Sequence, residues 1–412
     1  MTIWIPTWSI SIDGVGEFKD VTLANLTIAS GRTDIYSQAV AGYCNINYIE
    51  LNDGAITPSI NDSITIYIND STGTAIPIFG GSITDIVVEV TGSGSGGVSQ
   101  TISIVALGAL SRLPKVLFND ALPKALDGVQ IDTVLSGILF SSWQDLSASL
   151  TWNDYDPTQI WANAENAGLG EIDTGDYELA ARAADTIDAY SLVSALATSG
   201  LGYLYEDASG QISYADSTHR SQYLQANGYV DLSANQAFSA GLQIATRSGD
   251  IRNSITVTYK NSQQVSAEDA ESIATYGSLA QNFQTSLENT ADATSQADFY
   301  LALRSFPSPN MNQISFPLGS PELDDSDRDS LLNVFMGMPV NINDLPSNMG
   351  DAFQGFVEGW KFSAGYNSLT ISLYITPVSY SLQAFRWNDV PVVETWNTIE
   401  PTLEWINATI VA

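Results

Sequence analysis

Two runs of alternating residues, separated by a stretch of glycine and serine, constrain the fold of this chain more than any other feature. Along residues 79–90, Ile83 and Val87 share one face and β-branched residues dominate, which is typical of a strand. Residues 98–110 repeat the pattern. The segment between them, 91–97, supplies residues that tolerate any backbone conformation and bury nothing. We therefore predict a β-hairpin with a mobile tip of seven residues.

A short basic run with two prolines follows the hairpin and breaks the alternation. In this run, Arg112, Pro114 and Lys115 mark the place where the chain leaves the strands. A short helix is then expected to extend through Leu139, with Asp132 as its cap. The pattern predicts that the chain enters a different domain here.

The chain has 412 residues, which exceeds one ordinary core and predicts two to four domains. Lys and Arg number 14 against 46 Asp and Glu, so the net charge is −32. This balance argues against direct binding to DNA or RNA, although an acidic surface could line a passage through which a polyanion slides. Because charged residues make up only 15% of the chain, a β-rich assembly protein is favoured over a helical enzyme.

Cys44 is the only cysteine, which excludes an intrachain disulfide and a thiolate metal cluster. Its neighbours alternate, so we interpret it as a small buried hydrophobe on a strand rather than a reactive thiol. The N-terminus shows no basic region followed by a long apolar run, and the apolar runs elsewhere are too short to cross a bilayer. We expect neither a signal peptide nor insertion into a membrane.

Shifts in composition divide the chain into four parts. Residues 1–112 predict a first β-barrel, 113–235 an α+β insert domain, 236–385 a second β-barrel with helices, and 386–412 an extended arm. The expected fold class is β-rich α+β, with two β-barrel domains, α+β insertions and an extended C-terminal arm.

Local signals place helices and a hairpin within these parts. A helix over 185–198, capped by Asp185, precedes a hairpin whose strands are 202–207 and 211–216. Two further helices are expected, one that starts at Ser266 and one near 291–304.

Residues that carry chemistry are sparse. His219, the only histidine, lies in a solvated turn, and no G-x-S-x-G motif occurs, so nucleophilic catalysis is disfavoured. The hairpin glycines precede a strand rather than a helix, which disfavours nucleotide binding. We predict no catalytic residue, no metal site and no cofactor.

An acidic cluster resembles part of a calcium loop, but it lacks the central glycine and the closing glutamate. We interpret it as the start of a helix, where carboxylates are favourable. Its members are Glu322, Asp324, Asp325, Asp327 and Asp329. A glycosidase would also need two carboxyl groups, and with 46 acidic residues the sequence does not discriminate against one.

The final segment contains three tryptophans at intervals of nine residues, with Pro391 and Pro401 between them. Large aromatic anchors can fill pockets on a neighbouring subunit, and they can equally pack on the chain's own second barrel. Both interpretations remain open. The candidate interface residues are Gly92, Gly94 and Gly96 of the hairpin together with Trp387, Trp396 and Trp405 of the arm.

Blocks of sequence along residues 1–380 resemble, in their order, the tail hub proteins of long-tailed phages that infect actinobacteria, also described as minor tail or baseplate-hub-like proteins. No single block is decisive. The blocks are WSISIDG at 8–14, residues 29–54, 78–90, 101–115 and 127–139, the helix and hairpin at 194–220, SAEDAESIATYG at 266–277, and residues 355–377.

The resemblance implies a structural protein of the virion at the distal tip of the tail, made in the host cytoplasm. Three copies would form a ring that adapts the sixfold tail tube to a threefold tip and closes the lumen. Implied partners are the distal tail ring protein, the tape-measure protein, and tip or receptor-binding proteins. Genomic DNA would pass through the lumen without sequence-specific binding.

Two alternatives to a structural hub stay open at this point. One is a glycan-degrading tail component that uses paired carboxylates. The other is a glycan-binding component that uses the C-terminal tryptophans on sugars.

Overall fold

The computed structural model describes residues 4–139, 168–237 and 242–378, with short gaps at 14, 20–21, 34, 36, 51–56, 95–96, 243, 261, 308–309, 312, 351 and 366–367. The expected arm at 386–412, with Trp387, Trp396 and Trp405, lies outside the described residues, as does Gly96.

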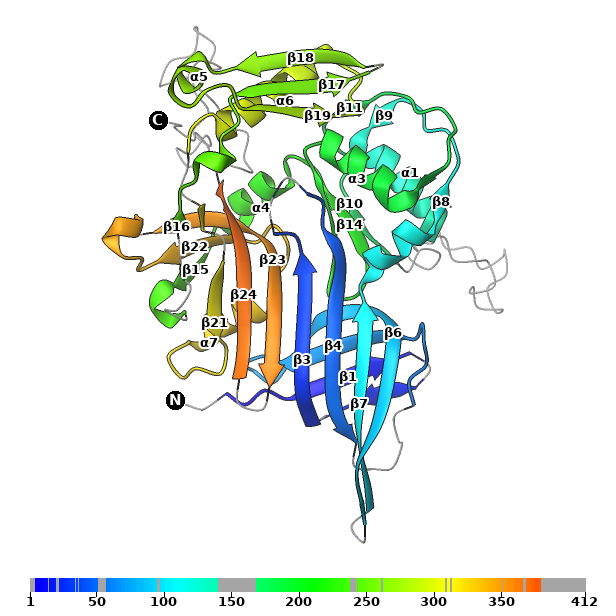
Figure 1. The fold of residues 1–412 in the computed structure, drawn as a ribbon. Helices are drawn as coiled ribbons and strands as arrows, with labels where there is room; N and C mark the ends of the chain where they lie inside the picture. The colour runs from blue at the N-terminus through cyan, green and yellow to red at the C-terminus, as the bar shows by residue number, and fades with distance from the viewer. Residues whose placement is uncertain are drawn as a thin grey trace.

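Twelve strands form the main sheet, which is predominantly antiparallel (Figure 1). In spatial order they are β15 (Val230–Ser233), β22 (Pro339–Asn343), β23 (Phe353–Gly365), β3 (Thr22–Gly31), β4 (Val40–Glu50), β7 (Gly97–Leu107), β6 (Ala75–Gly94), β5 (Ser63–Asn69), β1 (Trp8–Ile12) and β2 (Gly16–Phe18), while β24 (Ser368–Pro377) pairs with β23 and β21 (Ile314–Pro317). Within the described residues this path does not close on itself, so two closed barrels are not confirmed. The fold is a sheet-rich mixture of α and β structure.

Alternation of β-branched and polar residues explains why these segments form strands. In β5, Ile64, Ile66 and Ile68 are fully buried, and the residues between them are partly exposed. They pair in register with β1, from Trp8↔Ile68 to Ile12↔Ile64. Because successive side chains point to opposite faces of a strand, this register places one apolar face of the sheet in the core.

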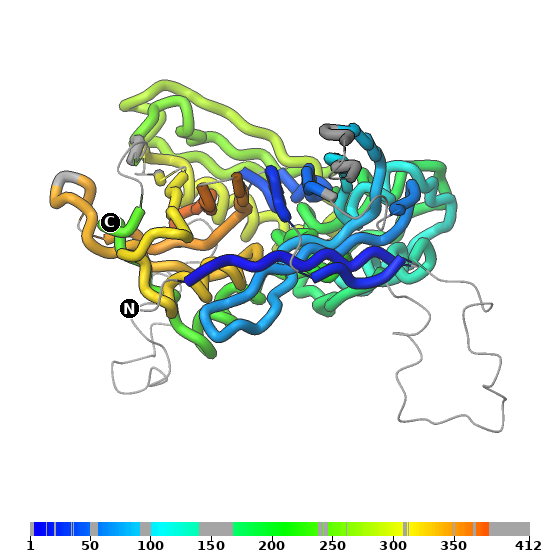
Figure 2. Tube along the Cα trace, turned by 90° about the horizontal axis from the view of Figure 1, so that it is seen from below, coloured from blue at the N-terminus to red at the C-terminus, as the bar shows by residue number. Residues whose placement is uncertain are grey.

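The two ends of the described chain share the main sheet through β3 and β23. They pair antiparallel over seven residues each, from Gly359↔Gly31 to Gly365↔Asn25. Figure 2 shows the blue N-terminal strands between the orange C-terminal strands and the cyan and green insert. Buried apolar side chains from all three regions form one connected core. The regions expected to be separate barrels are therefore joined by main-chain hydrogen bonds.

The hairpin of β6 and β7 differs from the sequence prediction. Its strands stay paired through the glycine- and serine-rich segment, as far as Gly94↔Gly97. The prediction of a seven-residue unpaired tip is wrong, because glycine and serine can continue a ladder once the flanking strands set its register. Figure 1 shows the hairpin extending beyond the remainder of the sheet.

The insert packs helices against short strands. Its elements are η1 (Ala109–Lys115), β8 (Leu117–Phe118), β9 (Ala125–Leu126), α1 (Asp127–Leu139), β10 (Leu169–Ile172), β11 (Glu178–Leu179), β12 (Ile187–Asp188), α3 (Ala189–Ser199), β13 (Tyr203–Glu206), β14 (Ile212–Ala215) and α4 (His219–Asn227), followed by η4 (Ala234–Gln236). The predicted hairpin is confirmed as β13 and β14.

Two predicted helix caps in the insert are wrong. Asp132 lies inside α1, which begins five residues earlier. The cap of α3 is Asp188 rather than Asp185, since the Asp188 carboxylate accepts a hydrogen bond of 2.8 Å from Ser191 N. Two aspartates precede α3, and only the backbone path decides which of them reaches an unpaired N–H group.

The C-terminal half adds a three-stranded sheet covered by a helix. Its elements are β16 (Ile244–Ala245), η5 (Ser248–Asp250), β17 (Ser254–Tyr259), β18 (Gln263–Glu268), α5 (Ala270–Tyr276), β19 (Ala280–Gln284), α6 (Thr290–Arg304), β20 (Asn310–Met311), α7 (Asp325–Leu332) and η6 (Ser347–Met349). Ser266 lies in β18, and Asp269 caps α5, so the predicted start at Ser266 is wrong. The helix predicted near 291–304 is confirmed as α6.

The acidic cluster begins α7, as predicted. Asp324 caps the helix by accepting from Asp327 N at 2.8 Å, and Asp329 accepts from Ser71 N at 2.8 Å. In the part of the chain that the structure covers, no group of three or more His, Cys, Asp or Glu is arranged to hold a metal ion. These carboxylates therefore serve the helix and its packing.

Cys44 is fully buried on β4, and burial raises the pKa of its thiol well above the ordinary value, which confirms the interpretation of an inert hydrophobe. Among the described helices, none is long and apolar enough to span a membrane.

The close approach of β3 to β23 predicts that a side chain at position 31 destabilises the fold. Gly31 has a φ of +84°, and a Cβ there would lie 2.4 Å from the Glu358 carbonyl oxygen. Gly31→Ala should therefore lower the free energy of unfolding by roughly 3 kcal/mol, from backbone strain and steric conflict together. Urea denaturation measures this change.

The matched control is Gly73→Ala, because Gly73 has a similar φ of +88° but open space around it. It should cost only the strain of the backbone, about 1 kcal/mol. Equal losses for the two variants would contradict the proposed close packing of β3 on β23.

Candidate functional site: a charged junction of three chain regions

Three charged residues from distant parts of the sequence meet where β3 ends. Arg32 directly follows β3, Arg220 lies on α4 of the insert, and Glu358 lies on β23. All three are buried, and Glu358 is 0% exposed. The regions predicted as first barrel, insert and second barrel therefore contact one another through charged side chains.

The Glu358 carboxylate accepts four side-chain hydrogen bonds. Arg32 Nε donates to Oε2 at 2.7 Å, and Arg220 donates to Oε1 at 2.7 Å and to Oε2 at 2.9 Å. The hydroxyl of Thr376, on β24, donates to Oε1 at 2.6 Å. A single carboxylate thus connects β3, α4 and β24 to β23.

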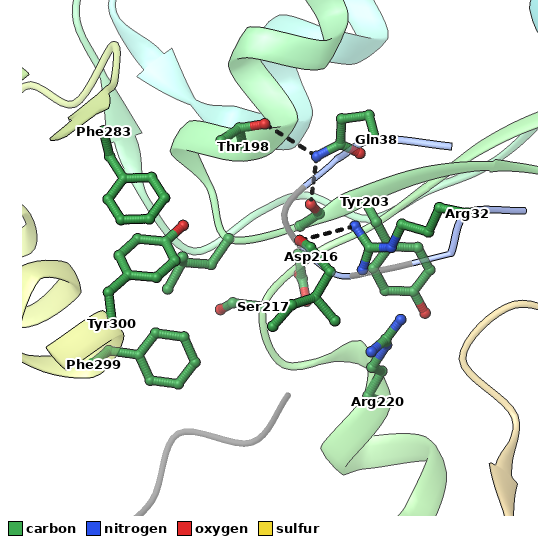
Figure 3. A pocket seen from close by; sticks show the side chains of 13 residues that line it. Arg32, Gln38, Thr198, Tyr203, Asp216, Ser217, Arg220, Phe283, Phe299 and Tyr300 are labelled. Carbon is green, nitrogen blue, oxygen red and sulfur yellow. Dashed lines mark hydrogen bonds between the residues drawn. The ribbon is translucent and has the colours of Figure 1, made fainter. Parts of the chain in front are cut away.

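Electrostatics favours the ionised form of this carboxylate. Burial alone would raise the pKa of Glu358, but the charges of Arg220 and Arg32 hold it well below its ordinary value. The Tyr203 ring lies beside both guanidinium groups, with its centroid 4.4 Å from Arg220 Cζ and 5.4 Å from Arg32 Cζ (Figure 3). The face of the Tyr203 ring therefore makes a cation–π contact with each guanidinium group.

A β-bulge aims the Glu358 side chain inward. β23 pairs with β22 as far as Phe356 and with β3 from Gly359 onward, and its register with β24 shifts between Val357 and Gly359. Glu358 is the residue at this shift, and its carbonyl accepts from Arg32 N at 2.9 Å. A bulge of this kind re-aims one side chain without ending the strand.

The loop between β3 and β4 binds the insert through Gln38. Its amide nitrogen donates to Thr198 Oγ1 at 3.2 Å and to Gly202 O at 3.1 Å (Figure 3). Its amide oxygen accepts from Leu204 N at 3.0 Å. Gln38 thereby satisfies polar groups at the turn between α3 and β13.

Glu206, at the end of β13, connects the insert to the main sheet. Its carboxylate accepts hydrogen bonds from Gly42 N on β4 and from Leu110 N, the latter at 2.9 Å. A Cβ on Gly108 would overlap Glu206 Oε1. Burial raises the pKa of Glu206 to about 7, although the two backbone hydrogen bonds oppose the rise.

The sequence suggested that His219 lies in a solvated turn, and this prediction is wrong. It is the first residue of α4, and its Nδ1 lies 2.8 Å from Asp173 Oδ2. The hydrogen bond with Asp173 raises the pKa of the imidazole. Asp216 accepts from His219 N at 3.1 Å and helps to start the helix. These contacts give His219 a structural role at the helix start.

A small cavity adjoins the junction. Its volume of about 70 Å³ has room for water but not for a sugar or a nucleotide. Figure 3 shows Phe283, Tyr300 and Phe299 on one side, and the two arginines with Tyr203 on the other. It is lined by Arg32, Ile35, Gln38, Thr198, Leu201, Gly202, Tyr203, Asp216, Ser217, Arg220, Phe283, Phe299 and Tyr300.

Two of the candidate interface residues, Gly92 and Gly94, fall in a described strand. Gly92 and Gly94 belong to β6 and not to an unpaired tip, while Gly96 and the three tryptophans fall outside the described residues. The structure does not bring the two glycines near the charged junction. Sequence reasoning missed Arg32, Arg220 and Glu358. One signal for Glu358 was available, namely an acidic residue within the apolar run from Phe356 to Trp360.

Comparison with known proteins establishes the fold. No protein-family model and no curated protein matches the sequence. Two tail proteins are among the solved structures that resemble it along nearly the whole length. The tail protein from Neisseria meningitidis MC58 is 11% identical with a TM-score of 0.59, and the match covers 92% of this chain and 98% of that one. The 43 kDa tail protein of prophage MuSo2 from Shewanella oneidensis is 11% identical with a TM-score of 0.55, covering 91% and 99%.

The charged junction predicts that Glu358→Gln strongly lowers the free energy of unfolding. The substitution keeps the volume but leaves two buried guanidinium groups without a counter-charge, so the free energy of unfolding should fall by about 3–5 kcal/mol. Urea denaturation of the variant measures the loss. Glu322→Gln, on an exposed side chain, is the control and should stay within about 0.5 kcal/mol of the parent. A Glu358→Gln variant as stable as the control would contradict the network.

Glu206 predicts a dependence of stability on pH. The folded carboxyl keeps its proton up to about pH 7, whereas the unfolded carboxyl has the ordinary pKa of 4.5. At a pH below 4.5, the pKa of the unfolded carboxyl, the protonated Glu206 side chain contributes its full stability to the fold. This contribution is lost as the pH rises to about 7, the pKa of the folded carboxyl.

The glutamine side chain of the Glu206→Gln variant cannot ionise, so this variant should lack the pH-dependent contribution of Glu206 to stability. Between about pH 5 and about pH 7.5, the parent should lose roughly 2 kcal/mol more than the variant. Urea denaturation at a series of pH values gives both curves, and the difference between them isolates Glu206 from His219 and the other groups. Parallel curves would show that Glu206 is already ionised at low pH.

Proposed function

We propose that this chain is a structural component of a phage tail. The observation that carries the proposal is the match of fold to two tail proteins, one of them from a prophage, which covers 91% or more of this chain and 98% or more of each of theirs. The match includes the insert as well as the sheet, so it concerns the whole architecture rather than one common motif.

The finer proposal is a hub at the distal end of the tail. Three copies would form a ring that adapts a sixfold tube to a threefold tip, closes the lumen and carries tip or receptor-binding proteins. The resemblance of the sequence blocks to tail hubs of phages that infect actinobacteria supports this role. The distal tail ring and tape-measure proteins would be its neighbours in the virion, and each half of the chain would supply one barrel-like unit of the ring.

The charge of the chain suits a protein beside the path of DNA. A net charge of −32 repels the phosphate backbone, so genomic DNA could slide past without adhering. The geometry of the junction also supports a scaffold. Its charged groups are buried and engaged with one another, which favours a fixed shape over chemistry at a solvent-accessible centre.

The mass of the assembled protein tests this proposal. The ring predicts particles of three times the chain mass of 44.2 kDa in mass photometry of the purified chain at high concentration or of complexes released from tails. Monomers under all conditions, including release from intact tails, would contradict the hub.

A glycan-degrading tail component remains the alternative in the enzyme class, and no observation in the described parts of the chain favours it. The structural proposal predicts that the purified protein releases no reducing ends from host cell-wall polysaccharide. Release that is lost on substitution of a single Asp or Glu would replace the structural proposal with the enzymatic one.

A further inference from the structure

Among the strands that the structure describes, β6 leaves one long edge of the main sheet unpaired, with Asp85, Glu89 and three valines exposed along it. β5 pairs with β6 only as far as Ser63↔Ser82, and the last hydrogen bond on that side runs from Asn61 N to Ile83 O at 2.9 Å. From Thr84 to Gly94, β6 has β7 on one side and no described strand on the other. Its outward N–H and C=O groups are therefore available to another strand.

The side chains along this edge are also available. Val87, Val88 and Val90 are 61%, 54% and 60% exposed. Since neighbouring residues of a strand point to opposite faces, the valines extend over both faces of the hairpin. Exposed β-branched residues on an unpaired strand are typical of a surface that docks a further strand.

The remaining ends of the main sheet are shorter. β2 has three residues and β15 has four, and short edges offer few hydrogen bonds. Part of the main sheet runs in the order β6-β7-β4-β3-β23-β24-β21. At the end opposite to β6, β21 has four residues and pairs only with β24 among the described strands. The run therefore has an unpaired edge at each end, and that of β6 is the longer.

We propose that the edge of β6 between Thr84 and Val90 docks on a second copy of this chain, at the β21 end of its sheet. The pairing of β3 with β23 shows that strands from the two halves of this sequence can join edge to edge over seven residues. The same kind of join between copies is heterologous, with different surfaces on the two partners, and such contacts form a ring when the rotation from copy to copy closes. Pro317 lacks an N–H group, so the contact uses the first part of β21.

The charge of the chain sets the conditions for this contact. Two copies with a net charge of −32 repel each other, and Asp85 and Glu89 place two of these charges on the edge itself. The attraction comes from the exposed valines and the backbone groups. Added salt screens the repulsion and should strengthen the association. The inference rests on the proposed function, because it describes how copies of a hub would join.

The test combines mass photometry with hydrogen exchange on the full chain. Val88→Lys with Val90→Lys places two charges at the edge and should weaken association roughly tenfold or more. Val129→Lys is the matched control, because Val129 is an exposed valine on α1, away from the hairpin, and should associate like the parent. In the unmodified protein, the amides of residues 84–90 should exchange at least about tenfold more slowly in the associated form than after dilution to monomers.

The outcomes separate this inference from the proposed function. If the protein forms trimers, but the double lysine variant associates equally well and residues 84–90 gain no protection, the edge contact is overturned and the hub proposal stands. If the protein is monomeric at every concentration and in complexes released from tails, the hub proposal fails and the contact fails with it. The exchange measurement needs no substitution, so it decides the question even where a variant folds poorly.

Discussion

The Glu358 carboxylate is the constraint on which the rest of the structure depends. It is fully buried and carries a charge, so it is tolerable only while both guanidinium groups remain in place. Arg32 can reach it only if β3 ends beside the bulge in β23, and Arg220 only if α4 packs over the same point. Displacement of either element would leave an unpaired charge in the interior. The network thus fixes three chain regions relative to one another, in addition to the apolar core that they share.

The other polar contacts extend this arrangement across the insert. Glu206 receives backbone N–H groups from β4 and from the turn into η1, and Gln38 satisfies the turn before β13. Each contact joins the insert to the N-terminal strands through groups that are costly to leave unpaired. The resulting body presents the free edge of β6 at its surface.

Much of the local structure follows from the sequence, whereas the junction does not. Alternation correctly predicted the strands that pair around Ile86 and Ile104, and the hairpin of β13 and β14, because buried faces repeat every second residue. Helix starts were less certain, since Asp185 and Asp188 are both plausible caps and only backbone geometry selects one. The hairpin tip was misjudged because composition suggests flexibility even where pairing continues.

The contacts between regions left almost no local signal. Arg32 and Glu358 are 326 residues apart, and no motif next to either residue indicates which residue it pairs with. The pairing of β3 with β23 likewise depends on tertiary packing, so the sequence suggested two barrels where the described strands form one open sheet. The acidic residue within the apolar strand β23 was the one visible anomaly, and it marks the junction.

A cryo-electron microscopy map of an intact tail tip tests the central claim most directly. Three copies of this chain are expected in a ring at the distal end of the tail tube, with the Glu358 junction intact in each copy. A map in which this chain is absent from the tail, or is present as single copies outside a ring, would contradict the account.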